Sequence, residues 1–345
     1  MKILNKVALL FVLATQTIYA QTNQETNLWK SGRPDGHAPI SVMGDHYHNK
    51  GDIMFSYRYM FMNMSDLLQR TSAVNNSYAH DAGYMVTPLK MPMQMHMLGV
   101  MYAVSNKVTL SAMMNYITNN MDLQMRMPSG MTSKFSTKSN GFGDLKLGLL
   151  YKFINKNKNS LHGIVGLSIP TGTIEAEDET PMSSPNKVQL PYPMQIGSGT
   201  YDLDLGFTYL GQTTDFSWGS QLKATYRFGK NEYEYSLGNK YSFNNWFAYK
   251  TNNWLSFSGR LEGLVVESIN GANPNLMPMM VTTADTSNSG GTFINAGVGF
   301  NIYAFKGSLK NVRFGFEYAL PIYQEVIGIQ LAQQQTFTAG IQYSL

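Results

Sequence analysis

The sequence predicts an all-β fold, namely a 12-stranded antiparallel transmembrane β-barrel with an N-terminal periplasmic extension. Three observations lead to this expectation. Segments in which apolar and polar residues alternate recur along the chain, as in half-buried strands. The connections between these segments are alternately short and long. The last segment stays amphipathic up to Leu345, so it needs a neighbouring strand on both sides, which a closed barrel supplies.

Twelve segments with a period of two are expected to form the strands. They lie at residues 52–64, 93–105, 108–122, 143–154, 161–170, 200–211, 216–229, 240–251, 254–267, 291–305, 311–324 and 335–345. The connections after the even-numbered strands are short, whereas most of those after the odd-numbered strands are long. Short turns at one rim and long loops at the other are typical of outer-membrane barrels, with both termini on the periplasmic side.

The first 20 residues have the pattern of a cleaved secretory signal peptide. Lys2 and Lys6 flank the start of a short apolar run, and Ala20 precedes a polar segment. The apolar run is too short for a membrane-spanning helix. We therefore expect a signal peptide at residues 1–20, an N-terminal extension or plug at 21–50 and the barrel at 51–345, located in the cell outer membrane.

The composition agrees with a barrel whose outer surface contacts lipid. Charged residues make up only 14% of the chain, which contains 31 glycines, 21 tyrosines and 18 phenylalanines. Trp218, Trp246 and Trp254 are expected in an interfacial girdle. The alternative is a soluble sandwich or lipocalin-like barrel, which would carry charges on its outside. The net charge of +4 predicts no nucleic-acid partner, and the lack of cysteine excludes disulfides.

Strand parity predicts which side chains face the interior. Phe55 and Tyr57 mark the outer face of the first strand, so its methionines face inward, and the next two strands continue this pattern. The expected inner wall of thioethers consists of Met60, Met62, Met64, Met93, Met95, Met97, Met101 and Met113. Charged residues are also expected to face the lumen and mostly to pair across it. They include Arg58, Lys146, Asp202, Asp204, Lys223, Arg260 and Glu262.

Two interpretations of the methionine wall stay open. Methionine is flexible and apolar, so the wall could line a passage for a small hydrophobic or aromatic solute. Thioethers also select Cu(I), so the wall could instead carry a soft metal, copper or silver, as the transported ion. In that case the metal-contacting residues are Met43, His46, His48, Met93, Met95, His96 and Met97. Neither interpretation requires a resident cofactor.

Several stretches resemble a known family. They are GFGDLKLGLLYKF at 141–153, LSIPTGT at 167–173 and GSGTYDLDLGFTYLG at 197–211. They are similar to the MetA-pathway (phenol degradation) type of outer-membrane β-barrel transporters, and residues 43–62 and 190–195 resemble a methionine-rich branch of it. The resemblance implies passive movement of a small molecule across the outer membrane, without a settled substrate.

An enzymatic or purely structural barrel is the remaining alternative. The sequence contains no G-x-S-x-G nucleophile motif, and its histidines are not placed with acids at facing strand ends. We therefore expect a channel and no enzyme activity. The expected partners are the outer-membrane lipid bilayer, a small-molecule solute and a periplasmic protein that could bind residues 21–50.

Overall fold

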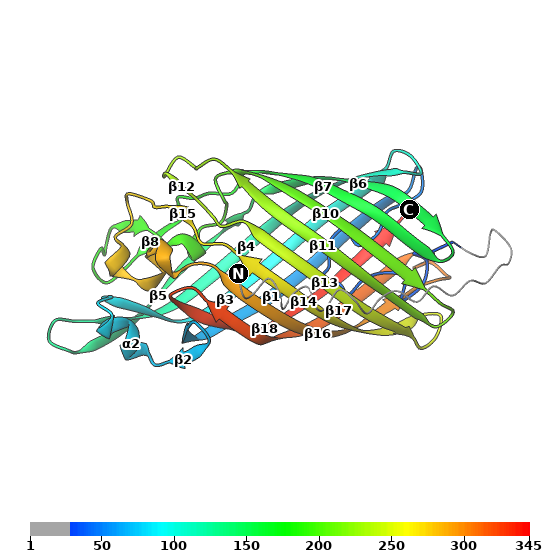
Figure 1. The fold of residues 1–345 in the computed structure, drawn as a ribbon. Coiled ribbons are helices and arrows are strands. Elements are labelled where there is room, and N and C mark those ends of the chain that lie inside the picture. Colours follow the sequence, from blue (N-terminus) through cyan, green and yellow to red (C-terminus); the bar gives the residue numbers. More distant parts are fainter. Residues whose placement is uncertain (1–27) are drawn as a thin grey trace, which may run out of the picture.

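The computed structural model describes residues 28–345, so the expected signal peptide lies outside the described residues. Within them, long antiparallel strands close into a 12-stranded barrel (Figure 1). The strands are β1 (Ile53–Gln69), β3 (Val86–Ala103), β4 (Val108–Arg126), β5 (Thr132–Phe142) with β6 (Leu145–Lys156), β7 (Asn159–Ile169), β10 (Tyr201–Gln212), β11 (Phe216–Phe228), β13 (Lys240–Lys250), β14 (Leu255–Val266), β16 (Gly291–Tyr303), β17 (Val312–Val326) and β18 (Ile329–Ser344). The predicted 12-stranded antiparallel barrel is confirmed.

The barrel closes where the first and last strands meet. β1 pairs with β18 from Met54 opposite Ser344 to Gln69 opposite Ile329. β1 also pairs with β3, so each end of the sheet finds a neighbour on both sides. Closure removes the unpaired edges that an open sheet would expose.

β5 and β6 together form one wall element beside β4. β4 pairs with β5 at Tyr116 opposite Phe142 and with β6 at Met113 opposite Lys146. The interruption carries Asp144, whose carboxylate accepts hydrogen bonds from the backbone N–H groups of loop residues Gly172 and Ser198. The break therefore anchors the long connection that follows β7.

The strands are longer than the sequence predicted at one end of the barrel. Residues 123–142 were expected as loop, but residues 123–126 extend β4 and residues 132–142 form β5. β5 has polar residues on both faces and so lacks the expected alternation. β1 continues past residue 64 through register shifts, with Asp66 at a positive φ of 62°. The shift leaves consecutive Leu67 and Leu68 both buried, which breaks the period of two.

The two ends of the barrel differ in their connections. We call one the short-turn end, with turns at residues 104–107, 157–158, 213–215, 251–254 and 304–311. The other is the long-loop end, where the connections include 70–85, 170–200 and 267–290. The expected boundaries of the last two strands, which left residues 325–334 as a connection, are wrong, because Ile327 and Gly328 alone form a tight turn in which Gly328 has a φ of +71°.

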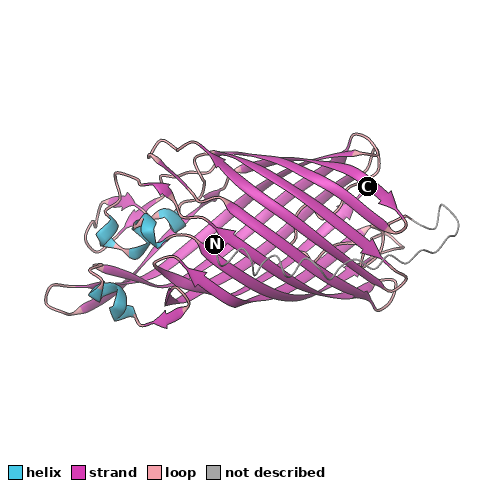
Figure 2. Cartoon of the chain, viewed as in Figure 1, coloured by secondary structure: helices cyan, strands magenta, loops and turns pink. Residues whose placement is uncertain are grey.

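Short secondary elements gather at the long-loop end, as the cartoon shows (Figure 2). They are β2 (Ser72–Val74), α2 (Asn76–Asp81), β8 (Glu177–Glu179), β9 (Lys187–Gln189), η3 (Tyr192–Met194), β12 (Tyr235–Ser236), β15 (Asn270–Gly271), η4 (Pro278–Met280), η5 (Thr282–Ala284) and η6 (Thr286–Asn288). Among the described residues, no helix is both long enough and apolar enough to cross a membrane.

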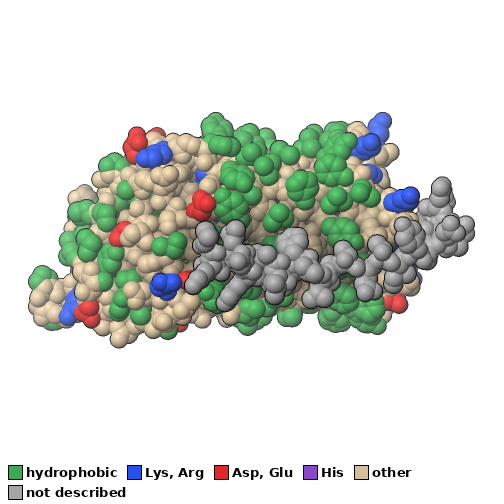
Figure 3. Space-filling view, in the orientation of Figure 1, with side chains coloured by type: hydrophobic (Ala, Val, Ile, Leu, Met, Phe, Trp, Pro, Cys, Tyr) green, Lys and Arg blue, Asp and Glu red, His purple; other side chains and the backbone are tan. Residues whose placement is uncertain are grey.

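The outer face of the barrel is apolar. On β3, Leu98 and Tyr102 are exposed, whereas their neighbours Met97 and Met101 are buried. Hydrophobic side chains cover the visible wall, and charged side chains lie mainly toward the two ends (Figure 3). This pattern is typical of a barrel wall that contacts lipid.

The expected place of Trp246 in an outer aromatic girdle is wrong. Trp246 faces the interior and packs with Trp29 and Leu210 in a buried cluster. The opposite residue on β11 is Gly219, and a Cβ there would lie 2.2 Å from the Trp246 ring. Because Gly219 has no side chain, the Trp246 indole can pack over it inside the barrel.

Residues 28–50, which we call the N-terminal segment, run inside the barrel. The segment begins at the short-turn end, where the Trp29 backbone N–H donates to Asn155 Oδ1 at 2.9 Å. It reaches the middle of the barrel, where Ser41 Oγ donates to Glu317 Oε2 at 2.6 Å. It then returns to the short-turn end, where the Lys50 N–H donates to Asn106 Oδ1 at 2.9 Å before β1 begins. The described part of the extension is thus largely enclosed by the strands.

Candidate functional site

Inward-facing methionines of β1 and β3 lie directly opposite one another. From the long-loop end the pairs are Met64 with Met91, Met62 with Met93, Met60 with Met95 and, nearer the short-turn end, Met54 with Met101. Directly opposed residues of antiparallel strands hold their Cβ atoms about 5 Å apart, close enough for side-chain contact. Met113 on β4 lies opposite Gly99, on the far side of β3 from β1. The register therefore produces a thioether surface from Met64 and Met91 to Met97, which Ser56 and Gly99 separate from the Met54–Met101 pair.

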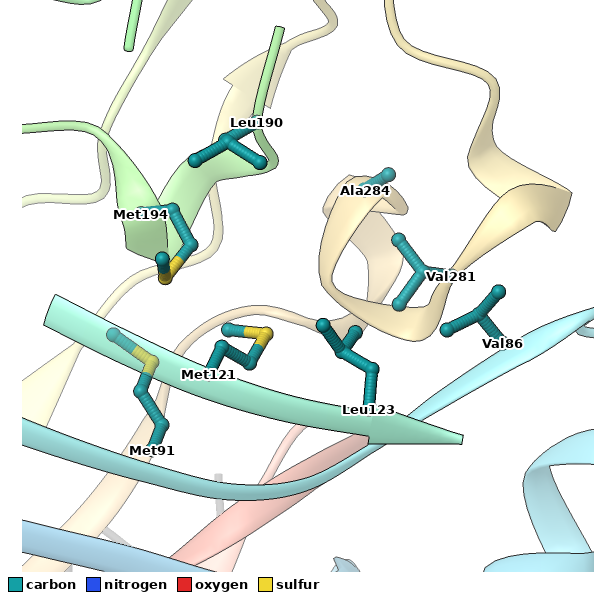
Figure 4. Packing of buried hydrophobic residues seen from close by; sticks show 8 residues of the cluster. All are labelled: Val86, Met91, Met121, Leu123, Leu190, Met194, Val281 and Ala284. Atoms are coloured by element: carbon teal, nitrogen blue, oxygen red, sulfur yellow. The ribbon is translucent and has the colours of Figure 1, made fainter. Parts of the chain in front are cut away.

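The methionine surface ends in an apolar cluster at the long-loop end (Figure 4). Met91, Met121 and Leu123 from the strands meet Leu190 and Val281 from the long connections, with Val86, Met194 and Ala284 completing the cluster. Beside it is a cavity of about 340 Å³, which we call the outer apolar cavity. Its lining includes Phe135, Met125, Met182, Leu276, Met277 and Met280. Such a lining suits an apolar ligand.

A second cavity, of about 280 Å³, lies in the middle of the barrel. Met60 and Met62 line one side, whereas Lys223, Arg260 and Glu262 line another. This mid-barrel cavity brings together two groups of residues that the sequence predicted separately. Its walls are therefore apolar toward β1 and charged toward β11 and β14.

Several charged residues of the interior form pairs, whereas the expected pairing is not seen at Arg58 or Lys146 among the described residues. Arg260 lies 2.6 Å from Glu317 and 3.3 Å from Glu262. Lys223 lies 3.2 Å from Asp204. A further pair joins Arg227 and Asp202. The Lys223 and Arg227 pairs join neighbouring strands β10 and β11, whereas Arg260 of β14 reaches Glu317 of β17 past the intervening strand β16. These ion pairs brace the wall and reduce the free charge in the lumen.

The inner residues of the first strands contact the N-terminal segment. Arg58 Nη1 donates to the thioether of Met43 at 2.9 Å, and Arg58 lies opposite Met97 on β3. Met113 and Lys146 line a smaller cavity of about 110 Å³ together with His46 of the segment. Ordered contacts from the wall thus fix the tip of the segment.

The predicted metal-contacting residues do not all come together. His96 faces outward, where its Nδ1 lies 2.8 Å from the Tyr57 hydroxyl and its ring lies 5.1 Å from that of Tyr59. Its inclusion in the set was wrong, because alternation along β3 turns it away from inward Met95 and Met97. Met43 and His46 line the small cavity with Met54, Met101 and Met113, whereas Met93, Met95 and Met97 do not.

Four residues of the N-terminal segment form a buried cluster that the sequence identified only in part. His46 Nδ1 lies 2.9 Å from Asp45 Oδ1, and His37 Nδ1 lies 3.5 Å from Asp45 Oδ2. The ring centroid of His46 lies 4.1 Å from that of His37 and 4.8 Å from that of His48. His37 was absent from the predicted set because nine residues separate it from His46, and only the turn of the segment joins them.

Comparison with known proteins places the fold. No family model matches the sequence, and no curated protein matches it. Among solved structures, the COG4313 outer membrane channel from Pseudomonas putida F1 aligns with a TM-score of 0.62 and 13% identity, over 89% of this chain and 100% of that chain. The chain therefore has the fold of an outer-membrane channel barrel.

Two further solved structures are similar at lower scores. A Pseudomonas aeruginosa FadL homologue aligns with a TM-score of 0.44 and 8% identity, over 93% of this chain and 99% of that one. The CymD monoaromatic hydrocarbon channel aligns with a TM-score of 0.40 and 10% identity, over 86% of this chain and 88% of that one.

Proposed function

We propose that the protein is an outer-membrane channel for the passive passage of a small hydrophobic or aromatic solute. The observation that carries the proposal is the outer apolar cavity, which the long connections and the ends of β3, β4 and β5 enclose. A volume of about 340 Å³ lies within the usual range for small-molecule sites. The resemblance of residues 141–153 and 197–211 to the MetA-pathway family supports passive passage of a small molecule, without settling which one.

The proposed path runs from the outer apolar cavity along the methionine surface to the mid-barrel cavity. Met91 belongs to the apolar cluster beside the first cavity, and Met60 and Met62 line the second. Flexible thioethers adapt to solutes of different shape. The N-terminal segment acts as a plug in the short-turn half, so the solute leaves when this segment shifts.

The apolar outer face supports a location in the lipid bilayer of the outer membrane. Large apolar side chains such as Leu98, Phe207 and Val298 are exposed on the wall. Water contact with so many apolar groups would be unfavourable, whereas hydrocarbon contact is not. In this location the long-loop end faces the outside of the cell and the short-turn end faces the periplasm.

Placing a charge in the outer apolar cavity tests the proposal. Met280 lines the cavity, whereas its neighbour Met279 does not line it and is 51% exposed. We expect Met280→Asp to lower uptake of a radiolabelled monoaromatic hydrocarbon by intact cells several-fold, because the carboxylate makes the cavity unfavourable for an apolar solute. The matched control Met279→Asp should leave uptake unchanged. Equal uptake by both variants and the parent would contradict the proposal.

The methionine pairs favour a second candidate, the passage of a soft metal. Thioethers opposite one another along β1 and β3 could transfer Cu(I) or Ag(I) from pair to pair. Changing Met93, Met95 and Met97 together to Leu keeps the volume and removes the sulfur. If the wall carries metal, cells with this variant should lose the copper or silver sensitivity that the parent confers, while aromatic uptake persists. Unchanged metal sensitivity would reject this candidate.

A further inference from the structure

We propose that the N-terminal segment holds a divalent transition-metal ion, Zn²⁺ or Cu²⁺, at a resident site made by His37, Asp45 and His46. The site is distinct from the methionine surface and does not depend on which solute the channel passes. One ligand atom from each of these three residues can be chosen so that all three lie within 4.8 Å of one another. All three side chains are buried.

One of the two distances within the cluster fits ligands of one ion, and the other is shorter because it is a hydrogen bond. Ligands bound at about 2.0–2.2 Å in a tetrahedral arrangement lie roughly 3.3–3.6 Å from each other. The separation between His37 Nδ1 and Asp45 Oδ2 is 3.5 Å, and that between His46 Nδ1 and Asp45 Oδ1 is 2.9 Å. Small movements of side chains would therefore bring the three groups onto a shared ion.

Unsatisfied ring nitrogens give a second, independent indication of a ligand. Within the described residues, His37 Nδ1, which lies toward Asp45, is buried without a hydrogen-bond partner. His46 Nε2 and His48 Nε2 are also unpartnered, although His46 Nε2 is the ring nitrogen other than the Nδ1 that contacts Asp45. Burying a polar atom without a partner is unfavourable, so such atoms point to a group that binds them. The His48 ring lies next to that of His46 and can supply a further nitrogen.

The type of ligand selects the type of metal. Imidazole nitrogens with one carboxylate suit Zn²⁺ and Cu²⁺, whereas Mg²⁺ and Ca²⁺ prefer oxygen ligands. Two positive groups from the wall lie near the segment and oppose a cation. Both keep their charge while they donate to neutral acceptors: Arg313 to the Ala38 carbonyl, Gln342 and Asn301, and Arg58 to the Met43 sulfur. Asp45 contributes the one negative charge of the cluster and favours a cation there.

The position of the site gives the ion a structural role. His37 lies on the part of the segment that enters the barrel, and Asp45 and His46 lie on the part that returns. The Ala38 N–H already donates to Asp45 Oδ2 at 3.0 Å between the two parts. An ion bound to all three residues would cross-link these parts and hold the segment in place beneath the mid-barrel cavity.

Metal titration of the refolded full chain tests the proposal. After treatment with a chelator, the protein is titrated with Zn²⁺ alone or Cu²⁺ alone against a chromophoric competitor. We expect one tightly bound ion per chain. His37→Gln, Asp45→Asn and His46→Gln should each weaken binding at least about tenfold, because each removes a ligand. The matched control His96→Gln, on the outer face, should bind like the parent, as should the Met93, Met95 and Met97 triple-Leu variant.

Two results would overturn the proposal: no tight ion in the parent, or equal weakening by His96→Gln. If the cluster variants fail to refold, the Cu²⁺ electron paramagnetic resonance spectrum of the parent decides the matter. Nitrogen hyperfine splitting from at least two imidazoles supports the site. A spectrum with oxygen ligands only rejects it.

Discussion

Inward side chains in the two halves of the barrel interior make different kinds of contact. In the long-loop half, thioethers and aliphatic groups such as Met121 and Leu123 pack on one another and leave an apolar cavity. In the short-turn half, polar wall residues bond to the N-terminal segment, as when Ser217 Oγ donates to the Asp35 carbonyl and Ser256 Oγ to the Pro34 carbonyl. Apolar side chains need no hydrogen-bond partner, whereas buried polar side chains do.

This difference explains where the interior is open. A methionine surface can face an empty cavity without leaving hydrogen-bonding groups unpaired. The polar wall is covered instead by the turns of the segment and by ion pairs such as Arg260 with Glu317. The chemistry of the wall thus differs along the barrel: the long-loop half holds the apolar cavity, and the short-turn half holds the polar side chains that bond to the segment.

Removal of the covering segment is expected to have the largest effect. Deleting residues 28–46 removes the chain that fills the short-turn half, so single-channel conductance should rise from nearly closed to clearly ohmic. Deleting the β8–β9 hairpin at residues 177–189 changes only the long-loop end and serves as control. If both deletions leave conductance at the parent level, the segment is not what closes the channel.

The second-largest effect is expected from breaking the ion pair between Arg260 and Glu317. Arg260 and Glu317 are both buried, so Arg260→Met leaves an uncompensated carboxylate and should lower the free energy of unfolding by about 3–5 kcal/mol. Lys223→Met breaks a pair in which the lysine is more exposed, so it should lower the free energy of unfolding by less than Arg260→Met does. Urea unfolding in lipid vesicles measures both. A larger loss for Lys223→Met would show that burial does not set the strength of these pairs.

An added charge on the outer face of the barrel should be destabilising, because that face contacts lipid. Leu261 is 52% exposed in the middle of β14, next to inward Arg260. A charge facing hydrocarbon is unfavourable, so Leu261→Arg should lower the free energy of unfolding by about 2–4 kcal/mol in the same assay. Leu261→Met should leave it nearly unchanged. A negligible effect of the arginine would mean that this face does not contact lipid.

The smallest effect is expected in the loops over the outer apolar cavity. The Tyr84 hydroxyl donates to Asp285 Oδ2 at 2.6 Å and joins two long connections. Burial raises the pKa of Asp285, but hydrogen bonds from Tyr84 and Ser287 outweigh it, so the pKa lies below its usual value. The resulting stabilisation is present above the usual aspartate pKa and is lost as pH falls through the lowered pKa.

Tyr84→Phe should therefore weaken the loop contact by about 1 kcal/mol at neutral pH and flatten its dependence on acid pH. Hydrogen exchange of residues 70–85 and 267–290 measures this local loss. Tyr209→Phe removes a hydroxyl that bonds to Asn159 at the short-turn end and should not affect these loops. Faster exchange in both variants would indicate a general loss of stability.

The sequence by itself determined which side chains face inward along most of the wall. Alternation is a local property of a strand, so parity at Arg58, Met60, Met97 and Lys146 follows from their neighbours in the chain. It also determined the closed antiparallel barrel, because every amphipathic strand needs a partner on each side. It failed at Leu67 and along β5, where a bulge and two polar faces remove the periodic signal.

The tertiary structure alone decided which inward residues meet. The register of β1 against β3 places Met62 opposite Met93, and the path of the N-terminal segment brings His37 to His46. The outer apolar cavity forms because connections nearly a hundred residues apart, at Leu190 and Val281, pack over the same strand ends. Such contacts depend on loop paths and pairing registers, which periodicity does not encode, because the period of a strand fixes the direction of a side chain but not its neighbour.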